Sequence, residues 1–329
     1  MQQKTVGECL MADHSSKIQT FADQVRAIPG GEHLEMCYSC GTCVSKCMIQ
    51  QKVEPEYNPR RLLHLVIMDM RDEAFKSPTT WLCSACDLCY PACPQEIHIS
   101  DVIGAVKQLA VEAGYESPLE TVSVNESLCS GCGICVMSCP YEAPHLVEKE
   151  VDGLMDRFSE VDPNGCMGCG ICVAACPMGA ISRPGVSNEE VRAQLDVPRR
   201  NGAPRLVAFV CDWCLRADAD VTLLDNSPEN VQVVHIPCTG RIDPEMALMA
   251  LGSGVDGVLV CGCAPGECHY QRGTTVSSCK IGLLNRALEQ MNMGDGRVRF
   301  VQIGTQDRGR IRSEIDHMMD HLVAWKEAV

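Results

Sequence analysis

One cysteine spacing, C-x2-C-x2-C-x3-C, occurs four times in this chain of 329 residues. Two-residue gaps allow one loop to present three thiolates to a compact cofactor, and soft thiolates are the ligands that iron–sulfur clusters take. The spacing is that of the ligands of a cubane 4Fe-4S cluster. The four runs are Cys37, Cys40, Cys43, Cys47; Cys83, Cys86, Cys89, Cys93; Cys129, Cys132, Cys135, Cys139; and Cys166, Cys169, Cys172, Cys176.

The fourth cysteine of each run lies on the segment that follows the loop. In two-cluster proteins with this spacing, that cysteine binds the other cluster of the pair. Proline follows it in three runs, as this motif requires, whereas Met48 follows Cys47. The expected ligand sets are Cys37, Cys40, Cys43 with Cys93; Cys83, Cys86, Cys89 with Cys47; Cys129, Cys132, Cys135 with Cys176; and Cys166, Cys169, Cys172 with Cys139.

Structural zinc is the alternative for these cysteines. Zinc sites usually combine two separate C-x-x-C pairs, so each loop supplies two ligands. Three closely spaced cysteines followed by a fourth, in runs that come in pairs, fit that arrangement poorly. The spacing therefore favours four 4Fe-4S clusters, which would make the chain a conductor of electrons.

Net charge and hydropathy exclude several kinds of partner. The formal net charge is −15, and cubane clusters held by thiolates would add more negative charge. This disfavours binding to nucleic acid and to anionic lipid. No apolar run approaches the roughly 18 residues that a membrane helix needs, and the first residues lack the apolar core of a signal peptide. We therefore expect a cytoplasmic protein without membrane insertion, whose closely spaced cysteines bind metal.

Hydrophobic periodicity predicts a multidomain α+β chain. Helical spacing dominates as far as Gly114, and Asn58 and Ser100 are placed to cap helices. From Arg205 on, β-rich runs alternate with helical patterns, which indicates a parallel sheet covered by helices. The predicted divisions are a helical arm over 1–34, an α-helical two-cluster domain over 35–117, a compact two-cluster domain over 118–184, a linker over 185–203 with a short helix started by Ser187-x-x-Glu190, and an α/β domain over 204–329.

Cysteines of the last domain gather where its predicted strands end. Strand ends and the loops after them carry Cys211, Cys214, Cys238, Cys261, Cys263 and Cys268. In an open α/β sheet, ligands bind beyond the carboxyl ends of the strands, so these thiols converge on one edge. A 2Fe-2S cluster needs four thiolates. The first choice of ligands is Cys211, Cys214, Cys238 and Cys268, and Cys263 is the next candidate.

Several of these cysteines also fit other roles. Cys211 and Cys214 have the spacing of a thioredoxin-like dithiol at a strand–helix junction. Cys261 and Cys279 fit small buried apolar residues, and Cys279 shares one predicted inward helix face with Val276 and Leu283. Cys261 therefore adds an ambiguity to the ligand set.

Polar neighbours of these cysteines have two interpretations each. His269, beside Cys268, is expected to support a ligand or lie at the surface rather than bind metal. His235 lies within a predicted strand and is expected to be structural. Arg241 either tunes a cluster potential through its charge or forms a surface ion pair.

Three segments resemble known iron–sulfur families. The first two runs, with CYSCGTC at 37–43, NPR at 58–60 and WLC at 81–83, resemble the C subunit of heterodisulfide reductase. The last domain resembles the delta subunit of methyl-viologen-reducing hydrogenase through CDWC at 211–214, CTGRIDPE at 238–245 and GCAPGECHY at 262–270. The middle domain is similar to two-cluster bacterial-type ferredoxins.

This resemblance implies a place in a flavin-based electron-bifurcating complex of the heterodisulfide reductase type. In that family a delta-like domain takes electrons from a hydrogenase or formate dehydrogenase through a 2Fe-2S cluster and passes them to an A-like subunit that contains flavin. A C-like domain carries electrons on to a B-like, disulfide-reducing subunit. This chain departs from the pattern because it fuses both domains around a ferredoxin-like domain, which leaves open the branch that it serves.

The favoured interpretation is an electron-transfer subunit with four 4Fe-4S clusters, one 2Fe-2S cluster and no substrate site of its own. The sequence contains no G-x-G-x-x-G after a strand, no P-loop and no evident Ser-His-Asp pattern. Two alternatives remain. One is a thiol–disulfide redox enzyme that uses Cys211 and Cys214, and the other is an iron–sulfur sensor or scaffold for a regulatory partner.

Overall fold

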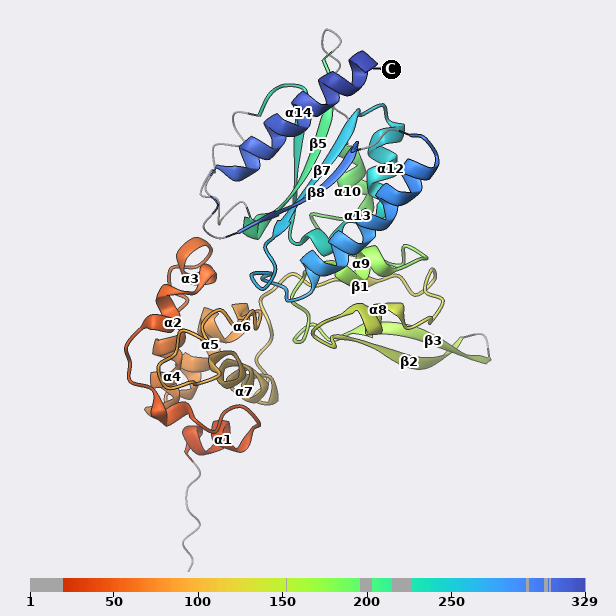
Figure 1. Cartoon of the computed structure of the whole chain (residues 1–329). Coiled ribbons are helices and arrows are strands. Elements are labelled where there is room, and N and C mark those ends of the chain that lie inside the picture. The colour runs from red at the N-terminus through yellow and green to blue at the C-terminus, as the bar shows by residue number, and fades with distance from the viewer. Residues whose placement is uncertain are drawn as a thin grey trace, which may run out of the picture.

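The structure is a computed structural model, and it describes residues 20–151, 153–195, 203–214, 227–293, 296–304, 307 and 309–328. Three units follow one another along the chain (Figure 1). We call them the helical unit, residues 20–117, the hairpin unit, residues 118–185, and the sheet unit, which comprises the described residues from 186 on. The start of the predicted arm, 1–19, and much of the predicted linker, 196–202, lie outside the described residues.

The helical unit surrounds one apolar core. The predicted cap at Asn58 is confirmed: its side chain accepts a hydrogen bond of 3.0 Å from the Arg61 backbone N–H and starts α4 (Pro59–Ile67). The predicted cap at Ser100 is wrong, because α7 (Ile99–Glu112) already includes Ser100, and the Ser100 hydroxyl donates to Asp87 instead. The remaining helices are α1 (Phe21–Ala27), η1 (Leu34–Met36), α2 (Thr42–Ser45), α3 (Met48–Lys52), α5 (Arg71–Lys76) and α6 (Pro78–Leu82).

The hairpin unit is small and built on two antiparallel strand pairs. Short strands β1 (Ser123–Val124) and β4 (Ile181–Ser182) close it, and β2 (Pro144–Val151) pairs with β3 (Leu154–Val161) along all eight residues. The β2–β3 hairpin projects from the unit (Figure 1). Two short helices, α8 (Ile134–Ser138) and α9 (Ile171–Ala175), each follow one cysteine loop. The unit therefore contains the same pattern of cysteine loop and short helix twice.

The sheet unit confirms the predicted parallel sheet. Its four strands lie in the order β6-β5-β7-β8, and every neighbouring pair is parallel. The strands are β5 (Leu206–Cys211), β6 (Val231–Ile236), β7 (Gly257–Cys263) and β8 (Val298–Ile303). After β5 the chain pairs first on one side, as β6, and then on the other, as β7. The carboxyl ends of these three strands therefore form a topological switch point, where such sheets bind ligands.

Helices cover both faces of this sheet (Figure 1). On one face α14 (Arg310–Ala328) buries Ile311, Ile315, Met318 and Leu322, as its period predicts. The other face packs against α12 (Pro244–Gly252), α13 (Gly273–Gln290) and α10 (Asn188–Ala193). The helix predicted within the linker is α10, and its capping box joins Ser187 and Glu190.

Part of the segment predicted as a linker packs against the parallel sheet. Val186, Val191 and Leu195 are buried in the core on one face of the sheet, so residues 186–195 belong to the sheet unit. This packing anchors the segment that follows the hairpin unit to one face of the sheet. Among the described residues, no helix combines the length and apolar character that a bilayer crossing requires.

Candidate metal centres

The structure gathers the cysteines of the four runs into crossed sets. One cavity of about 350 Å³ is lined by Cys37, Cys40, Cys43 and Cys93, together with apolar residues such as Leu63 and Ile97. We call this group of four thiols site A. A second cavity, of about 330 Å³, is lined by Cys129, Cys132, Cys135 and Cys176, which we call site C. A third, of about 310 Å³, is lined by Cys139, Cys166, Cys169 and Cys172, which we call site D.

The fourth set, site B, consists of Cys83, Cys86, Cys89 and Cys47. Burial raises the pKa of Cys47 to about 11, and the charges of Cys86 and Cys83 add to this effect. Burial also raises the pKa of Cys89, with contributions from Cys83, Cys86 and Cys47. Cys47 therefore lies among the cysteines of the second run, although Met48 rather than proline follows it and starts α3.

All four cysteine loops share one backbone conformation. The residue before the second cysteine and the residue after it both have left-handed φ angles, between 51° and 81°. Glycine takes most of these positions, because it adopts positive φ without steric cost. In site B both positions lack glycine: Ala85 has φ 51° and Asp87 has φ 59°. In this conformation, a residue other than glycine costs roughly 1–2 kcal/mol of conformational free energy. The backbone of the site B loop is therefore strained at two positions.

Backbone amides point at several of the sulfur atoms. Hydrogen bonds to thiolate sulfur stabilise its negative charge and are one means by which proteins set cluster potentials. The contacts are Ser39 N–H to Cys37 Sγ at 3.4 Å, Ser159 N–H to Cys129 Sγ at 3.4 Å, Gly168 N–H to Cys166 Sγ at 3.5 Å and Ala180 N–H to Cys176 Sγ at 3.3 Å.

These cavities fit iron–sulfur clusters by their donor sets. Each is lined by four thiols and largely apolar residues, and no carboxylate or imidazole lines any of the three. All-sulfur donors select iron–sulfur clusters or zinc, and three ligands from one loop with a fourth from another favour the cluster. The assignment of individual cysteines as ligands remains a prediction that this geometry agrees with.

A fifth group of thiols lies at the carboxyl edge of the parallel sheet. The sulfur atoms of Cys211, Cys214 and Cys263 all lie within 4.8 Å of one another, and all three residues are buried. Cys263 Sγ is 3.9 Å from Cys211 Sγ and 3.6 Å from Cys214 Sγ. Hydrogen bonds from Cys238 and Cys263 lower the pKa of Cys268 to about 2, which places those two cysteines beside it. We call these five thiols the sheet-edge site.

Cys263 occupies the middle of the sheet-edge site. It contacts Cys211 and Cys214, and hydrogen bonding with those thiols raises its pKa. The sequence analysis ranked Cys263 as a candidate ligand after Cys211, Cys214, Cys238 and Cys268. In the structure, however, Cys263 has more thiol neighbours than any other cysteine of the site. The site contains five thiols, whereas a 2Fe-2S cluster needs four. The choice of the four ligands therefore remains a prediction.

Helix α13 begins directly against this site. A Cβ added to Gly273, its first residue, would lie 2.0 Å from Cys238 Sγ and 3.6 Å from Cys268 Sγ. Thr274 donates to the Cys263 carbonyl at 3.0 Å, and its hydrogen bonds lower the pKa of Cys268. The positive end of the helix dipole favours thiolate there. Sequence reasoning missed Gly273, although a glycine at a helix start so soon after GCAPGECHY was a possible signal.

The two remaining cysteines that the structure describes have different environments. Cys261 is fully buried in β7, as expected for a small apolar residue, and its charge contributes to raising the pKa of Cys214. Cys279 is exposed, so its predicted inward position is wrong. The buried face of α13 carries Thr274, Ser277 and Ile281, because the contact of Gly273 with Cys238 sets the rotation of the helix.

The polar residues near the cysteines of the sheet-edge site differ in burial and contacts. Arg241 is fully buried and donates to the Val186 carbonyl at 2.9 Å and to Asn188 Oδ1 at 2.6 Å, so the predicted surface ion pair is wrong. His269 is buried and stacks on Trp213, with ring centroids 3.3 Å apart. His235 Nδ1 lies 3.4 Å from Asp212, in agreement with a structural role.

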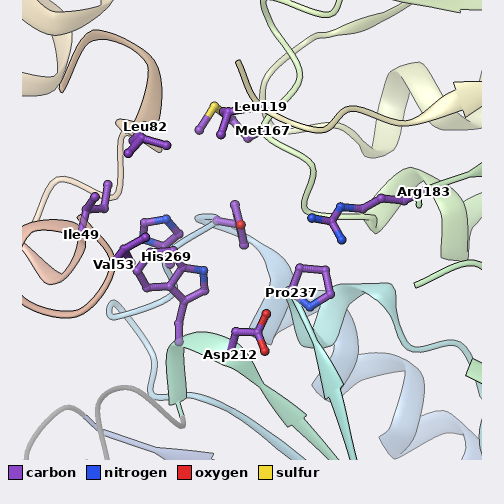
Figure 2. A pocket seen from close by; sticks show the side chains of 11 residues that line it. Ile49, Val53, Leu82, Leu119, Met167, Arg183, Asp212, Pro237 and His269 are labelled. Carbon is purple, nitrogen blue, oxygen red and sulfur yellow. The ribbon is translucent and has the colours of Figure 1, made fainter. Parts of the chain in front are cut away.

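A hollow of about 650 Å³ opens beside the sheet-edge site, where all three units meet. Figure 2 shows side chains that reach it from each unit: Ile49 and Leu82, Met167 and Arg183, and Asp212 and His269. The Nε atom of Arg183 is buried without a hydrogen-bond partner. The sheet-edge site thus lies at a junction of the three units rather than at a free end of the chain.

Comparison with known proteins assigns the sheet unit. A family model described as methyl-viologen-reducing hydrogenase, delta subunit, matches residues 206–324. The iron-sulfur D subunit of an F420-non-reducing hydrogenase from Archaeoglobus profundus is 39% identical over 99 residues, which cover 30% of this chain and 72% of that protein. The chain belongs to the hydrogenase delta-subunit family. All five thiols of the sheet-edge site lie within the segment that matches this family.

The segments before residue 206 match other families. Models of 4Fe-4S dicluster domains match residues 33–97, 82–143 and 128–181, and together they cover all four cysteine runs. The C subunit of a H(2):CoB-CoM heterodisulfide,ferredoxin reductase from Methanothermobacter marburgensis is 32% identical over 98 residues, which cover 30% of this chain and 51% of that protein. These matches confirm an iron–sulfur protein with dicluster domains.

A third relative is much longer than this chain. The A subunit of a ferredoxin/F(420)H(2)-dependent CoB-CoM heterodisulfide reductase from Methanosarcina acetivorans is 32% identical over 139 residues. The match covers 41% of this chain, but the chain spans only 18% of that relative's length. This member of the delta-subunit family is therefore homologous to parts of both hydrogenase and heterodisulfide reductase subunits.

Proposed function

We propose that this protein is a multi-cluster electron-transfer subunit of a heterodisulfide-reductase-like complex. Sites A to D would each hold one 4Fe-4S cluster, and four thiols of the sheet-edge site would hold one 2Fe-2S cluster. The observation that carries the proposal is the gathering of crossed four-thiol sets, in which each fourth cysteine comes from the other run of its pair. Matches to dicluster and delta-subunit families support it.

The chain itself contributes ligands, burial and charge. When bound, the clusters would supply one-electron transfer and no bond-making chemistry. The cysteines hold them, left-handed loop residues aim backbone N–H groups at sulfur, and apolar residues such as Leu63 and Ile97 exclude water. Buried Arg241 places a positive charge near site D. Charge and hydrogen bonding of this kind set the potentials of the sites.

The names of the relatives indicate which partner proteins we propose. We propose that the sheet unit receives electrons from a hydrogenase or formate dehydrogenase, since its relatives are named as hydrogenase subunits. Two further proteins would complete the complex, one A-like with flavin and one B-like that reduces a disulfide, since the helical unit resembles a C subunit. Electron bifurcation in such a complex is part of this proposal.

Burial argues against the thiol–disulfide alternative. A catalytic dithiol must meet its substrate, but Cys211 and Cys214 are 2% and 1% exposed. Alkylation distinguishes the two functions. In the holo-protein, both cysteines should resist iodoacetamide until iron is removed. Ready labelling of Cys211 and Cys214 in fully loaded protein would favour the dithiol.

Isolation of the native complex tests the proposed function. The protein is affinity-purified without oxygen from the cells that make it, and its companions are identified by mass spectrometry. We expect a flavoprotein and either a hydrogenase or a formate dehydrogenase to co-purify, and the sites to be reduced when hydrogen or formate is added. Isolation of the chain alone, with sites that neither substrate reduces, would contradict the proposal.

A further inference from the structure

The loop of site B contacts the loop of the sheet-edge site. Ser84 lies between Cys83 and Cys86, and its Oγ is 3.2 Å from Nδ1 of His269, the residue after Cys268. The Gln271 side chain donates to the Ala85 carbonyl at 3.1 Å. These contacts join residues that lie 185 and 186 positions apart in the chain. The helical unit therefore reaches the sheet unit through a cysteine loop.

The loop of site D contacts the sheet-edge site from the hairpin unit. Cys169 and Ile171 form one buried group with Cys238. A Cβ on Gly170 would lie 2.8 Å from Arg241 Cδ, and one on Gly240 would lie 2.7 Å from Ile171 Cγ1. Neither interface position has room for a methyl group without displacement of a neighbour, so the two loops are in close contact.

Aromatic side chains fill the space between these three sites. Tyr141 packs against the group of Cys169 and Cys238, and its hydroxyl donates to the Ser84 carbonyl at 3.1 Å. Tyr270 lies against His269, with ring centroids 4.8 Å apart. The side chains of Tyr141 and Tyr270 thus connect the cysteine loops of the three sites.

Sites A and C, in contrast, each reach the surface through one cysteine. Among the cysteines of sites A to D, only Cys40 of site A and Cys132 of site C are exposed in the structure as described. Apolar residues around them are exposed as well: Tyr38 is 70% exposed and Met137 is 75% exposed. Site D is buried, with Cys166, Cys169 and Cys172 below 9% exposure. Exposed apolar side chains around a surface redox site suit transient docking of another redox protein.

We propose that the sheet-edge site is the central link between two arms, in the order A, B, sheet edge, D, C, and that electrons received at the sheet edge leave the chain through redox partner proteins docked at A and C. This rests on the proposed function. Each electron that the donor loses at the sheet edge is gained by an oxidised partner at one of the two exposed sites. No bond is made and no proton is moved, so the exchange balances.

Magnetic coupling tests this order. The protein is reduced with dithionite, and the spin relaxation of the sheet-edge signal is measured by electron paramagnetic resonance. Cys86→Ala removes site B and Cys169→Ala removes site D, so each should slow that relaxation severalfold. Cys40→Ala and Cys132→Ala remove the outer sites and should leave it nearly unchanged. Unaltered relaxation in the Cys86→Ala protein would overturn the proposal.

A second measurement needs no variant. As the potential is lowered, the intact protein should show faster relaxation of the sheet-edge signal in two steps, one for each reduced neighbour. One step or none would overturn the central position. Iron analysis of the same samples separates the two proposals: a protein without iron contradicts the proposed function, whereas a fully loaded protein with one neighbour contradicts only the order of sites.

Discussion

Gly273 lies so close to Cys238 that a Cβ in its place would come within 2.0 Å of the Cys238 sulfur. No pair of carbon and sulfur atoms that are not bonded to each other tolerates that separation. The first residue of α13 and the cysteine after β6 are thus fitted to each other, although the sequence separates them by a strand and two helices. This relationship makes the glycine part of the sheet-edge site.

Replacement of Gly273 tests that fit. Gly273→Ala should displace Cys238 and prevent loading of the sheet-edge site, with sites A to D unaffected. Iron per chain should fall by about two, the content of one 2Fe-2S cluster. Quantitative iron analysis and the loss of the matching paramagnetic signal check this result.

Gly282 supplies the control in the same helix. It is exposed, and a Cβ there meets nothing within 4 Å. Gly282→Ala should therefore keep full iron and raise the free energy of unfolding by about 0.5–1 kcal/mol, since alanine favours a helix interior over glycine. Full iron in both variants would show that Cys238 is not needed where the structure places it.

Removal of one fourth ligand tests the crossed sets. Cys93 lines the cavity with Cys37, Cys40 and Cys43, so Cys93→Ala should damage site A and spare site B. Alkylation followed by peptide mapping should label Cys37, Cys40 and Cys43, while Cys47 stays protected.

The opposite pattern would mean that each run binds its own cluster. In that case Cys83, Cys86 and Cys89 would be labelled in the Cys93→Ala protein. Cys279→Ala is the matched control, because Cys279 is exposed and lies apart from the predicted sites. It should change neither iron content nor the labelling of the four runs.

Arg241 should raise the potential of site D. Its guanidinium is buried, no described carboxylate forms an ion pair with it, and its charge interacts with those of Asp243 and Cys172. A buried positive charge favours addition of an electron nearby. Arg241→Met should therefore lower the potential of site D by tens of millivolts, while Arg241→Lys should restore most of it. Redox titration followed by paramagnetic resonance measures both.

A variant of an exposed arginine distinguishes this local effect on the potential of site D from an effect of the protein's net charge. Arg192 pairs with Glu245 at 3.2 Å on the surface, where solvent screens its field. Arg192→Met should leave every potential within experimental error. A shift as large as that of Arg241→Met would indicate a general effect of net charge rather than a local one.

Acid should release the clusters. Burial raises the pKa of Cys43 and Cys47 to about 11 and of Cys169 to about 12, so without metal these thiols bind protons at neutral pH. A bound cluster needs them as thiolates, and protons therefore compete more strongly as pH falls. Iron loss to a colorimetric chelator should therefore accelerate steadily as the pH falls below these pKa values. A rate independent of pH would contradict ligation by these buried thiols.

Spacing alone predicted most of the candidate sites. Ligand geometry requires the C-x2-C-x2-C-x3-C run and its crossing, so Cys37, Cys93 and their counterparts could be paired without a structure. The second run carries a less visible feature. Ala85 and Asp87 adopt the left-handed conformation that glycine takes in other runs, and residue type alone does not indicate it.

Tertiary contacts determine which face of α13 is buried, and hydrophobic periodicity alone predicted the wrong face. The sequence favoured Val276, Cys279 and Leu283 as the inward face of α13, but Leu283 is 69% exposed. Ser277, Ile281 and Leu284 face inward instead, and the small residues Gly273 and Ser277 allow close approach to the sheet edge. The contact of Ser84 with His269 likewise has no local signal, since it joins two loops from different units.

The iron and sulfide content of protein isolated without oxygen tests the central claim most directly. Four 4Fe-4S clusters and one 2Fe-2S cluster predict about 18 iron and about 18 sulfide per chain, with paramagnetic signals after dithionite reduction. Colourless protein, or about 4 to 8 iron per chain together with stoichiometric zinc, would contradict the account.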